Sequence, residues 1–482
     1  MDKFARFRYQ PCIPLGDDGR CCTASEKHAQ LSRKAATEGM VLLKNENNAL
    51  PLAEGEKVAL FGKATIEYIK GGGGSGDVHT KYIRNIFDGF KMKEKEGKAS
   101  VYMPLVDFYK EYVEKESVHI PTQDQINATW DIVNAMEFCT KRDDMTYDTF
   151  ASMHVKEPAV PEELIKSASE WADTAVFTIS RFSAEGVDRR PQGGDYYLSD
   201  IEKNLIDSLC QLFNKVIIVI NSGATIDCEY FAENDKVSAV LMSWQGGMEG
   251  GLAIADILCG DVNPSGKMTD TVAKSYDCYP CKDEFWESFQ FIDYSDDIYV
   301  GYRYFETMAK DSVRYPFGFG LSYTTFSVSG RVCCESEGKI VAVATVKNTG
   351  AVAGKETLQL YYSAPQGKLG KPLRELAAYK KTKLLAPGES ETLVMSFNIG
   401  DMASFDDLGK IAKSAFLLEK GTYSFWLGNS VRDAEKLDFE YTVEEDTVVE
   451  QLKSWCKPFK LAKRMLADGS FEALPQSEEE YF

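Results

Sequence analysis

Apolar runs of strand length alternate with amphipathic helices along the first part of the chain. The runs that predict buried strands are residues 57–62, 174–179, 215–220 and 237–244. Helical spacing of apolar positions is found in residues 24–41, 106–113, 161–172, 199–212 and 247–258. Thr23 is the expected N-cap of the first helix, and Asp77 to Thr80 is a possible helix start. Buried strands separated by helices are typical of parallel sheets, so the pattern predicts an open, mostly parallel α/β sandwich domain.

The period of the pattern changes after residue 323. Short alternating or apolar runs occur at residues 340–346, 357–363, 391–397 and 421–427. Turn signals such as Asn348-Thr349-Gly350 separate them, and this spacing predicts an all-β sandwich. The tail, residues 446–482, has one helical stretch at 448–465 and then becomes acidic and polar. It is interpreted as a linker or docking arm.

Length and charge restrict the class of protein. A chain of 482 residues with 44% hydrophobic residues is long enough for about three domains with large cores. The formal net charge of −19 argues against nucleic acid and against anionic membrane surfaces, because both attract basic proteins. The sequence has no run of eighteen apolar residues, so no transmembrane helix is predicted. The first residues lack the apolar core of a signal peptide, so a cytoplasmic protein is expected.

Cysteine and histidine positions give no metal signature. The twelve cysteines are scattered, as expected of reduced thiols in a cytoplasmic protein. Cys278 and Cys281 form a C-x-x-C pair, but a zinc site usually needs a second pair or histidines in register. The four histidines lack such spacing. We therefore expect neither a metal ion nor a cofactor.

The strongest candidate for chemistry is Glu185, in the segment 180–190. It follows the predicted strand 174–179 and precedes a capping box, Ser199 to Glu202, that opens a helix. Open α/β sheets bind ligands at the carboxyl ends of their strands. The charges of Asp188, Arg189 and Arg190 would hold this loop in place. A solvated surface loop with a local ion pair remains the alternative interpretation.

Two glycine-rich segments are ambiguous. Residues 70–78 lack the lysine of a phosphate loop. Residues 65–70 separate them from the predicted strand, which the glycines of a dinucleotide site would follow directly. A flexible linker is one interpretation, and backbone that passes very close to a ligand or another domain is the one we favour. Residues 244–251 lie at a predicted strand end, where their glycines would admit a ligand or allow close helix–sheet packing. We assign Glu249 there to packing or to helix-start electrostatics.

Together these motifs resemble glycoside hydrolase family 3, the β-glucosidase group. The segments that carry the resemblance are residues 35–45, 71–78, 181–189, 194–199, 263–267, 298–305 and 315–324. The resemblance implies the family's α/β sandwich at residues 1–323, a fibronectin type III-like domain at 324–445 and a tail at 446–482. One departure is mild: Ala184 replaces the usual glycine before the glutamate.

The larger departure is that no segment of the chain accounts for the family's (β/α)₈ barrel, which carries the aspartate nucleophile. Such a barrel needs about 250 residues, and only the charged, helix-prone segment 79–173 is unassigned. The nearest Trp–Asp pair, Trp130-Asp131, has the reverse order of the family's Asp-Trp. The chain is similar to the leading half of a branch in which the sandwich precedes the barrel.

The resemblance implies a role for each candidate residue. Glu185 would be the acid/base of a retaining hydrolase that acts on terminal β-linked sugars, with its pKa raised in the assembled cleft. The glycine run would form a second edge of the cleft, with Gly74 and Ser75 near the substrate, and Arg181 and Phe182 would bind the substrate beside Glu185. The implied partners are a β-glycoside or oligosaccharide and a barrel domain or subunit, or a second copy of the chain. A non-catalytic carbohydrate-binding or scaffold module is the alternative.

Overall fold

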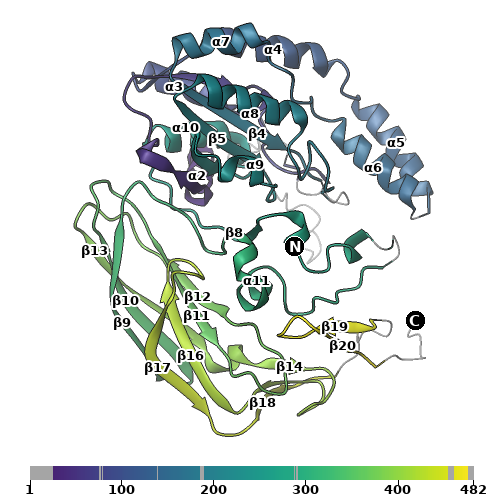
Figure 1. The fold of residues 1–482 in the computed structure, drawn as a ribbon, viewed down its shortest axis with the longest axis vertical. Helices are drawn as coiled ribbons and strands as arrows, with labels where there is room; N and C mark the ends of the chain where they lie inside the picture. The colour runs from purple at the N-terminus through teal and green to yellow at the C-terminus, as the bar shows by residue number, and fades with distance from the viewer. Residues whose placement is uncertain are drawn as a thin grey trace, which may run out of the picture.

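The computed structural model describes residues 25–74, 77–78, 80–137, 139–184, 189–286, 288, 291–453 and 461–475. It consists of an α/β part followed by an all-β part, which lie one above the other in Figure 1. Within these ranges no helix has the length and apolar character needed to cross a membrane.

A six-stranded sheet organises the α/β part. Its strands, in spatial order, are β1 (Val41–Asn45), β6 (Val237–Met242), β5 (Lys215–Ser222), β4 (Thr174–Arg181), β2 (Glu56–Phe61) and β3 (Ala99–Val101). All neighbours are parallel except β1 and β6. The chain places β3 on one side of β2 and β4 on the other. The strand order therefore reverses between β2 and β4.

Helices cover both faces of this sheet. One face carries the helices α4 (Met103–Ser117), α7 (Glu162–Trp171), α8 (Asp200–Leu212) and α9 (Glu229–Ala232). The other carries α2 (Glu26–Gly39), α3 (Ile86–Lys95) and α10 (Gly250–Leu258). Each face buries a separate hydrophobic core. Burial on both faces explains why the strands are continuous apolar runs in the sequence.

Helices α5 (Gln123–Ala135) and α6 (Thr140–Ala151) form a hairpin that extends beyond the sheet (Figure 1). None of their described residues belongs to either core of the sheet. This hairpin lies within the segment that the sequence describes only as charged and helix-prone.

The all-β part is a sandwich of two antiparallel sheets around one core. The first sheet contains β13 (Ser390–Asn398), β10 (Lys339–Asn348) and β9 (Phe326–Ser336). The second contains β12 (Glu375–Lys381), β11 (Thr357–Ser363), β16 (Gly421–Gly428) and β17 (Glu435–Val443). Smaller pairings involve β14 (Ser404–Asp406), β15 (Ala415–Leu418) and β18 (Thr447–Gln451), the hairpin β19 (Lys463–Met465) and β20 (Phe471–Ala473), and the pair β7 (Val272–Ala273) and β8 (Val313–Tyr315). Helix α11 (Tyr302–Met308) lies between the two parts of the chain (Figure 1).

Ion pairs join the two parts. Glu38, at the end of α2, accepts hydrogen bonds from Lys355 and from Lys381, the latter at 2.7 Å. Lys267 pairs with Glu356 at 2.8 Å. These contacts connect α2 and the loop after α10 to β12 and to the residues just before β11.

The predicted fold class, a mostly parallel α/β sandwich followed by an all-β sandwich, is confirmed. Three local predictions are wrong. The N-cap of the first helix is Ser25, whose side chain accepts from the His28 amide, and not Thr23. Helix α3 begins at Ile86 after the cap Asn85, and not at 77–80. Residues 448–465 are not helical where described: β18 pairs with β15, and β19 with β20.

Candidate functional site

The candidate site lies where the strand order reverses. Segments 62–74 and 182–199 leave the carboxyl ends of the adjacent strands β2 and β4. A parallel bridge between Gly73 and Ala184 joins the two segments. Such a switch point leaves a crevice because the two connections run to opposite faces of the sheet, and open α/β sheets bind ligands there.

Arg181 ends β4 in a buried ion pair. Its guanidinium donates to both carboxylate oxygens of Glu202, at 2.6 and 2.8 Å, and its Nε donates to the Asp195 carbonyl at 2.7 Å. Burial alone would raise the pKa of Glu202, but the Arg181 charge and the Ser199 donors lower it below the ordinary value. The same Glu202 closes the capping box of α8. The pair therefore ties the start of the loop to the helix that follows it.

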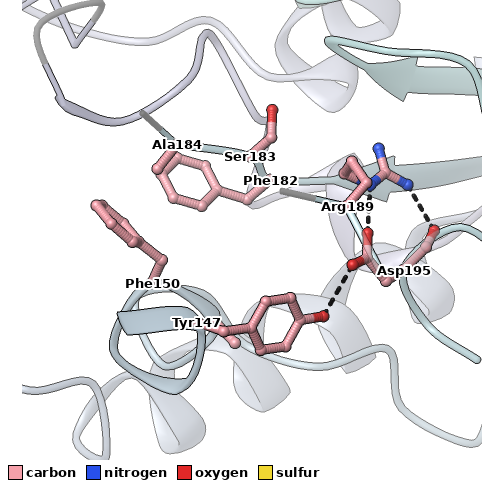
Figure 2. A pocket seen from close by; sticks show the side chains of 8 residues that line it. Tyr147, Phe150, Phe182, Ser183, Ala184, Arg189 and Asp195 are labelled. Atoms are coloured by element: carbon pink, nitrogen blue, oxygen red, sulfur yellow. Dashed lines mark hydrogen bonds and ion pairs between the residues drawn. The ribbon is translucent and has the colours of Figure 1, made fainter. Parts of the chain in front are cut away.

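Phe182 contacts two aromatic side chains. Its ring centroid lies 4.3 Å from that of His154 and 6.3 Å from that of Phe150. The His154 Nδ1 lies 3.0 Å from a Glu67 oxygen, so this ring is held on its other side. Phe182 also lines a small hollow shown in Figure 2. The residues around the hollow are Tyr147, Phe150, Ala151, Phe182, Ser183, Ala184, Arg189 and Asp195.

The glycine run passes directly against this aromatic group. The Gly73 amide donates to the Ser183 carbonyl at 3.0 Å. A Cβ on Gly73 would lie 2.9 Å from the Phe182 ring and 3.0 Å from the Ala184 side chain, so no larger residue fits without displacement. Gly73 is therefore required by close approach to the neighbouring segment of the same domain, and a Cβ on Gly72 would likewise lie 3.0 Å from the Ser183 carbonyl, whereas one on Gly71 would meet nothing within 4 Å.

Asp195 organises the return of the loop. Its carboxylate accepts from the Arg189 guanidinium, from the Arg190 amide at 2.7 Å and from the Tyr147 hydroxyl at 2.9 Å (Figure 2). Burial, followed by the nearby Asp195 charge, raises the pKa of Tyr147 to about 12, so this hydroxyl remains a donor at neutral pH. Burial lowers the pKa of Arg189. The interpretation that Arg189 and Arg190 hold the loop agrees with these contacts, while Asp188 lies outside the described residues.

A second polar cluster includes residues of the segment that connects β2 to the glycine run. Lys63 and Glu67 pair at 3.1 Å, and Glu157 accepts from the Lys63 amide at 2.9 Å. Burial raises the pKa of Glu157 to about 8, against which the Lys63 amide and charge act. These groups support the backbone between β2 and the glycine run.

The predicted site residues differ in where the structure places them. Glu185 and Ser75 lie outside the described residues. Gly74 is exposed and adopts φ of +76°. Phe182 lines the hollow, and the Arg181 guanidinium is directed into the protein.

The sequence interpretation missed three residues of this site: Tyr147, Phe150 and Asp195. Asp195 appeared only as part of a motif. Tyr147 and Phe150 stand in a segment that was interpreted as charged and helix-prone. A local signal exists for Tyr147 and Phe150. Tyr147 follows Asp143 by four residues and Phe150 follows Tyr147 by three, so Asp143, Tyr147 and Phe150 share one face of a helix.

The second glycine-rich segment is explained by packing. A Cβ on Gly250 would lie 2.0 Å from the Tyr68 hydroxyl, and one on Gly251 would lie 2.2 Å from the Asn85 backbone. Glu249 is buried beside them and accepts from the Tyr82 hydroxyl at 2.6 Å. The packing interpretation is therefore the one that agrees with the structure.

Sequence comparison identifies the family. Residues 40–323 match the glycosyl hydrolase family 3 C-terminal domain, and residues 356–431 match a fibronectin type III-like domain. The two matches define the class of the protein by its domains: a family 3 C-terminal α/β domain followed by a fibronectin type III-like domain. The chain belongs to glycosyl hydrolase family 3.

Its relatives include several β-glucosidases. Beta-glucosidase A of Butyrivibrio fibrisolvens is 46% identical over 99% of this chain and 59% of its own length. A β-glucosidase of Ruminococcus albus is 37% identical over 94% of this chain and 44% of its own length. The structure of a β-glucosidase from Paenibacillus barengoltzii superposes with a TM-score of 0.82 at 36% identity, over 97% of this chain and 49% of that one. The chain thus spans about half the length of these relatives.

Proposed function

We propose that this chain carries the acid/base part of a retaining β-glucosidase-type site, with Glu185 as the acid/base. The observation that carries the proposal is that both flanks of Glu185 are anchored at the strand-order reversal, in a chain that is 46% identical to a β-glucosidase. The substrate class is a terminal, non-reducing β-linked glucoside or xyloside. The domain organisation that goes with it is residues 1–323, 324–445 and 446–482.

The mechanism assigns two tasks to one carboxyl group. In a retaining enzyme the acid protonates the leaving-group oxygen while a second carboxylate, about 5–5.5 Å away, attacks the sugar. The acid, now ionised, then activates the water that releases the sugar. Glu185 suits the first task only if its pKa is raised by burial and by the partner carboxylate. We assign the nucleophile to a barrel outside this chain, supplied in a longer product or as a separate subunit.

The residues around Glu185 have supporting roles in this proposal. Phe182 and Gly74 border the substrate, as does Ser75. The Arg181 guanidinium, engaged by Glu202, orients the start of the loop, so its contribution to substrate binding is indirect. Among the residues that the structure describes, no group of three or more His, Cys, Asp or Glu side chains is placed to hold a metal ion.

The test uses the chain mixed with the separately expressed portion of the Butyrivibrio relative that it does not match. Glu185→Ala should slow hydrolysis of cellobiose, in which glucose is a poor leaving group, by about 10²–10⁴-fold, as for loss of a general acid. Hydrolysis of a dinitrophenyl glucoside should be slowed far less, because dinitrophenolate departs without protonation, and azide should partly restore this hydrolysis.

Glu249→Gln is the control, because Glu249 is buried in the packing of α10 and not at the crevice. Equal slowing of both substrates by Glu185→Ala, or a leaving-group-dependent loss in Glu249→Gln, would assign the chemistry to another carboxylate. A mixture that binds cellobiose without ever hydrolysing it would favour the carbohydrate-binding module instead.

A further inference from the structure

Helix α6 turns one face toward the candidate site. Asp143, Tyr147 and Phe150 are separated by four and three residues, so they lie along one face of the helix. Phe150 contacts Phe182, and Tyr147 contacts Asp195 (Figure 2). Asp143 accepts from Arg190. The face therefore spans both flanks of the four residues 185–188.

The flank that precedes Glu185 is held by aromatic contacts. Phe150 is 8% exposed, and its ring lies between those of Phe182, at 6.3 Å, and Trp130 of α5, at 5.1 Å. Offset and tilted aromatic pairs of this kind contribute beyond the area that they bury. Helix α6 thus fixes the position of Phe182, three residues before the glutamate.

The flank that follows is held by charged hydrogen bonds. The Arg190 guanidinium donates to Asp143 at 2.6 Å and to Asp144 at 2.9 Å, and it lies 4.2 Å above the Tyr147 ring. The Tyr147 hydroxyl accepts from Gln192 at 3.0 Å while it donates to Asp195. A planar guanidinium bonded at two nitrogens and stacked on a ring has a defined orientation.

These contacts join α6 to the described residues on either side of 185–188. The described residues of the α5–α6 hairpin contribute nothing to the two cores of the sheet. Their interactions therefore stabilise the loop flanks more than they stabilise the sheet. A helix with this distribution of contacts is expected to affect the loop selectively when it is altered.

We propose that α6 is the positioning element of the loop that carries Glu185, and that Tyr147 and Arg190 are positioning residues. Tyr147 and Arg190 touch no reacting atom. They set where the two described flanks, residues 182–184 and 189–195, lie. The catalytic consequence rests on the proposed function, whereas the position of the flanks does not. A misplacement of about 1 Å in a catalytic group costs about 10²-fold in rate.

The first test needs no activity. Amide hydrogen exchange of the full chain should become about tenfold faster or more in peptides that cover residues 183–198 in Arg190→Ala, the change expected for loss of one charged hydrogen bond. Tyr147→Phe should act in the same direction. Exchange in β4 and β5 should stay at the rate of the unaltered chain.

Two matched controls separate positioning from general destabilisation. Arg331→Ala removes a pair with Glu435 at 2.9 Å, and the Arg331 side chain is 25% exposed against 21% for Arg190. Tyr230→Phe removes a hydroxyl that donates to Asp207 at 2.7 Å, as Tyr147 donates to Asp195. Neither control should change exchange in residues 183–198.

The second test measures kinetics in the mixture with the relative's unmatched portion. Arg190→Ala should lower kcat for cellobiose by about 10–10²-fold, with KM little changed and with a smaller effect on the dinitrophenyl glucoside. Arg190→Lys should restore part of the loss, because lysine keeps the positive charge but lacks the planar guanidinium that bonds to two carboxylates at once.

Two results would overturn the proposal: exchange in residues 183–198 that matches the two controls, or faster exchange that is equal throughout the α/β part. If exchange rises locally while Glu185→Ala shows no leaving-group dependence, the positioning role holds and the proposed function fails. A mixture without activity leaves the exchange measurement to decide.

Discussion

At the scale of single residues, Glu157 has an environment unlike that of a surface carboxylate. Burial raises its pKa to about 8 from an ordinary value of 4.5. Its partners are the Lys63 amide at 2.9 Å and the Tyr109 hydroxyl at 3.4 Å. Both are donors, so they act against the shift, and burial is the cause that dominates. The folded protein therefore holds a proton on Glu157 that the unfolded chain has already lost at neutral pH.

This shift predicts a pH dependence of stability. Because the pKa of Glu157 is higher in the folded protein, the contribution of Glu157 to the free energy of unfolding should fall as pH rises from about 4.5 to about 8 and then level off. Glu157→Gln mimics the protonated form, so it should stabilise the protein by about 1–3 kcal/mol at pH near 9 and have little effect at pH near 4. Urea unfolding across this range measures it. Glu170→Gln, at an exposed position of α7, should lack the trend, and a parallel trend in both variants would contradict the assignment.

At the scale of elements, helix α8 links the candidate loop to the sheet. The Ser199 side chain accepts from the Glu202 amide, and the Glu202 side chain accepts from the Ser199 amide at 2.8 Å. The same Glu202 pairs with Arg181 at the end of β4. One capping box thus begins the helix and fixes the start of the loop.

Loss of this cap should be measurable. Ser199→Ala leaves the Glu202 amide without its side-chain acceptor and should lower the free energy of unfolding by about 0.5–2 kcal/mol. The control is Ser208→Ala in the same helix, where the hydroxyl bonds only to the Asn204 carbonyl one turn earlier. Chemical denaturation of both variants tests the difference. A Ser199 variant as stable as the Ser208 variant would show that the cap contributes little here.

At the scale of the whole molecule, the chain presents one assigned carboxylate of the two that retaining hydrolysis requires. It also spans about half the length of its β-glucosidase relatives. The two parts of the chain are joined by ion pairs such as Lys267–Glu356, so the α/β part and the sandwich are expected to act as one unit toward a partner.

We predict that the purified chain alone does not hydrolyse aryl β-glucosides or β-xylosides at ordinary enzyme rates, about 1–10³ per second. The reason is that protonation of the leaving group is of little use without a nucleophile on the other face of the sugar. The control is the mixture with the relative's unmatched portion, in which turnover should appear. Turnover at ordinary rates by the chain alone would refute the division of the site between two parts.

The apolar pattern of the sequence predicts the class of each part and the strands and helices that build the six-stranded sheet and the sandwich. Continuous apolar strands such as 215–220 reveal a sheet that is buried on both faces, and alternation in 391–397 reveals a sandwich strand with one solvated face. The capping box at Ser199 was visible because its signal is local. Residues 448–465 were misassigned because their apolar spacing suits a helix as well as a strand, and pairing of β18 with β15 decided the outcome.

Only the tertiary structure decided which residues meet at the site. The reversal of strand order between β2 and β4 brings the glycine run against Phe182, and no local pattern records that order. Likewise the sequence shows Asp143, Tyr147 and Phe150 at helical spacing, but not what their common face contacts. Arg181 illustrates the same limit, since the family resemblance implied contact with the substrate, whereas its buried guanidinium pairs with Glu202. Local signals fix local conformation, whereas contacts between distant segments follow from packing of the whole chain.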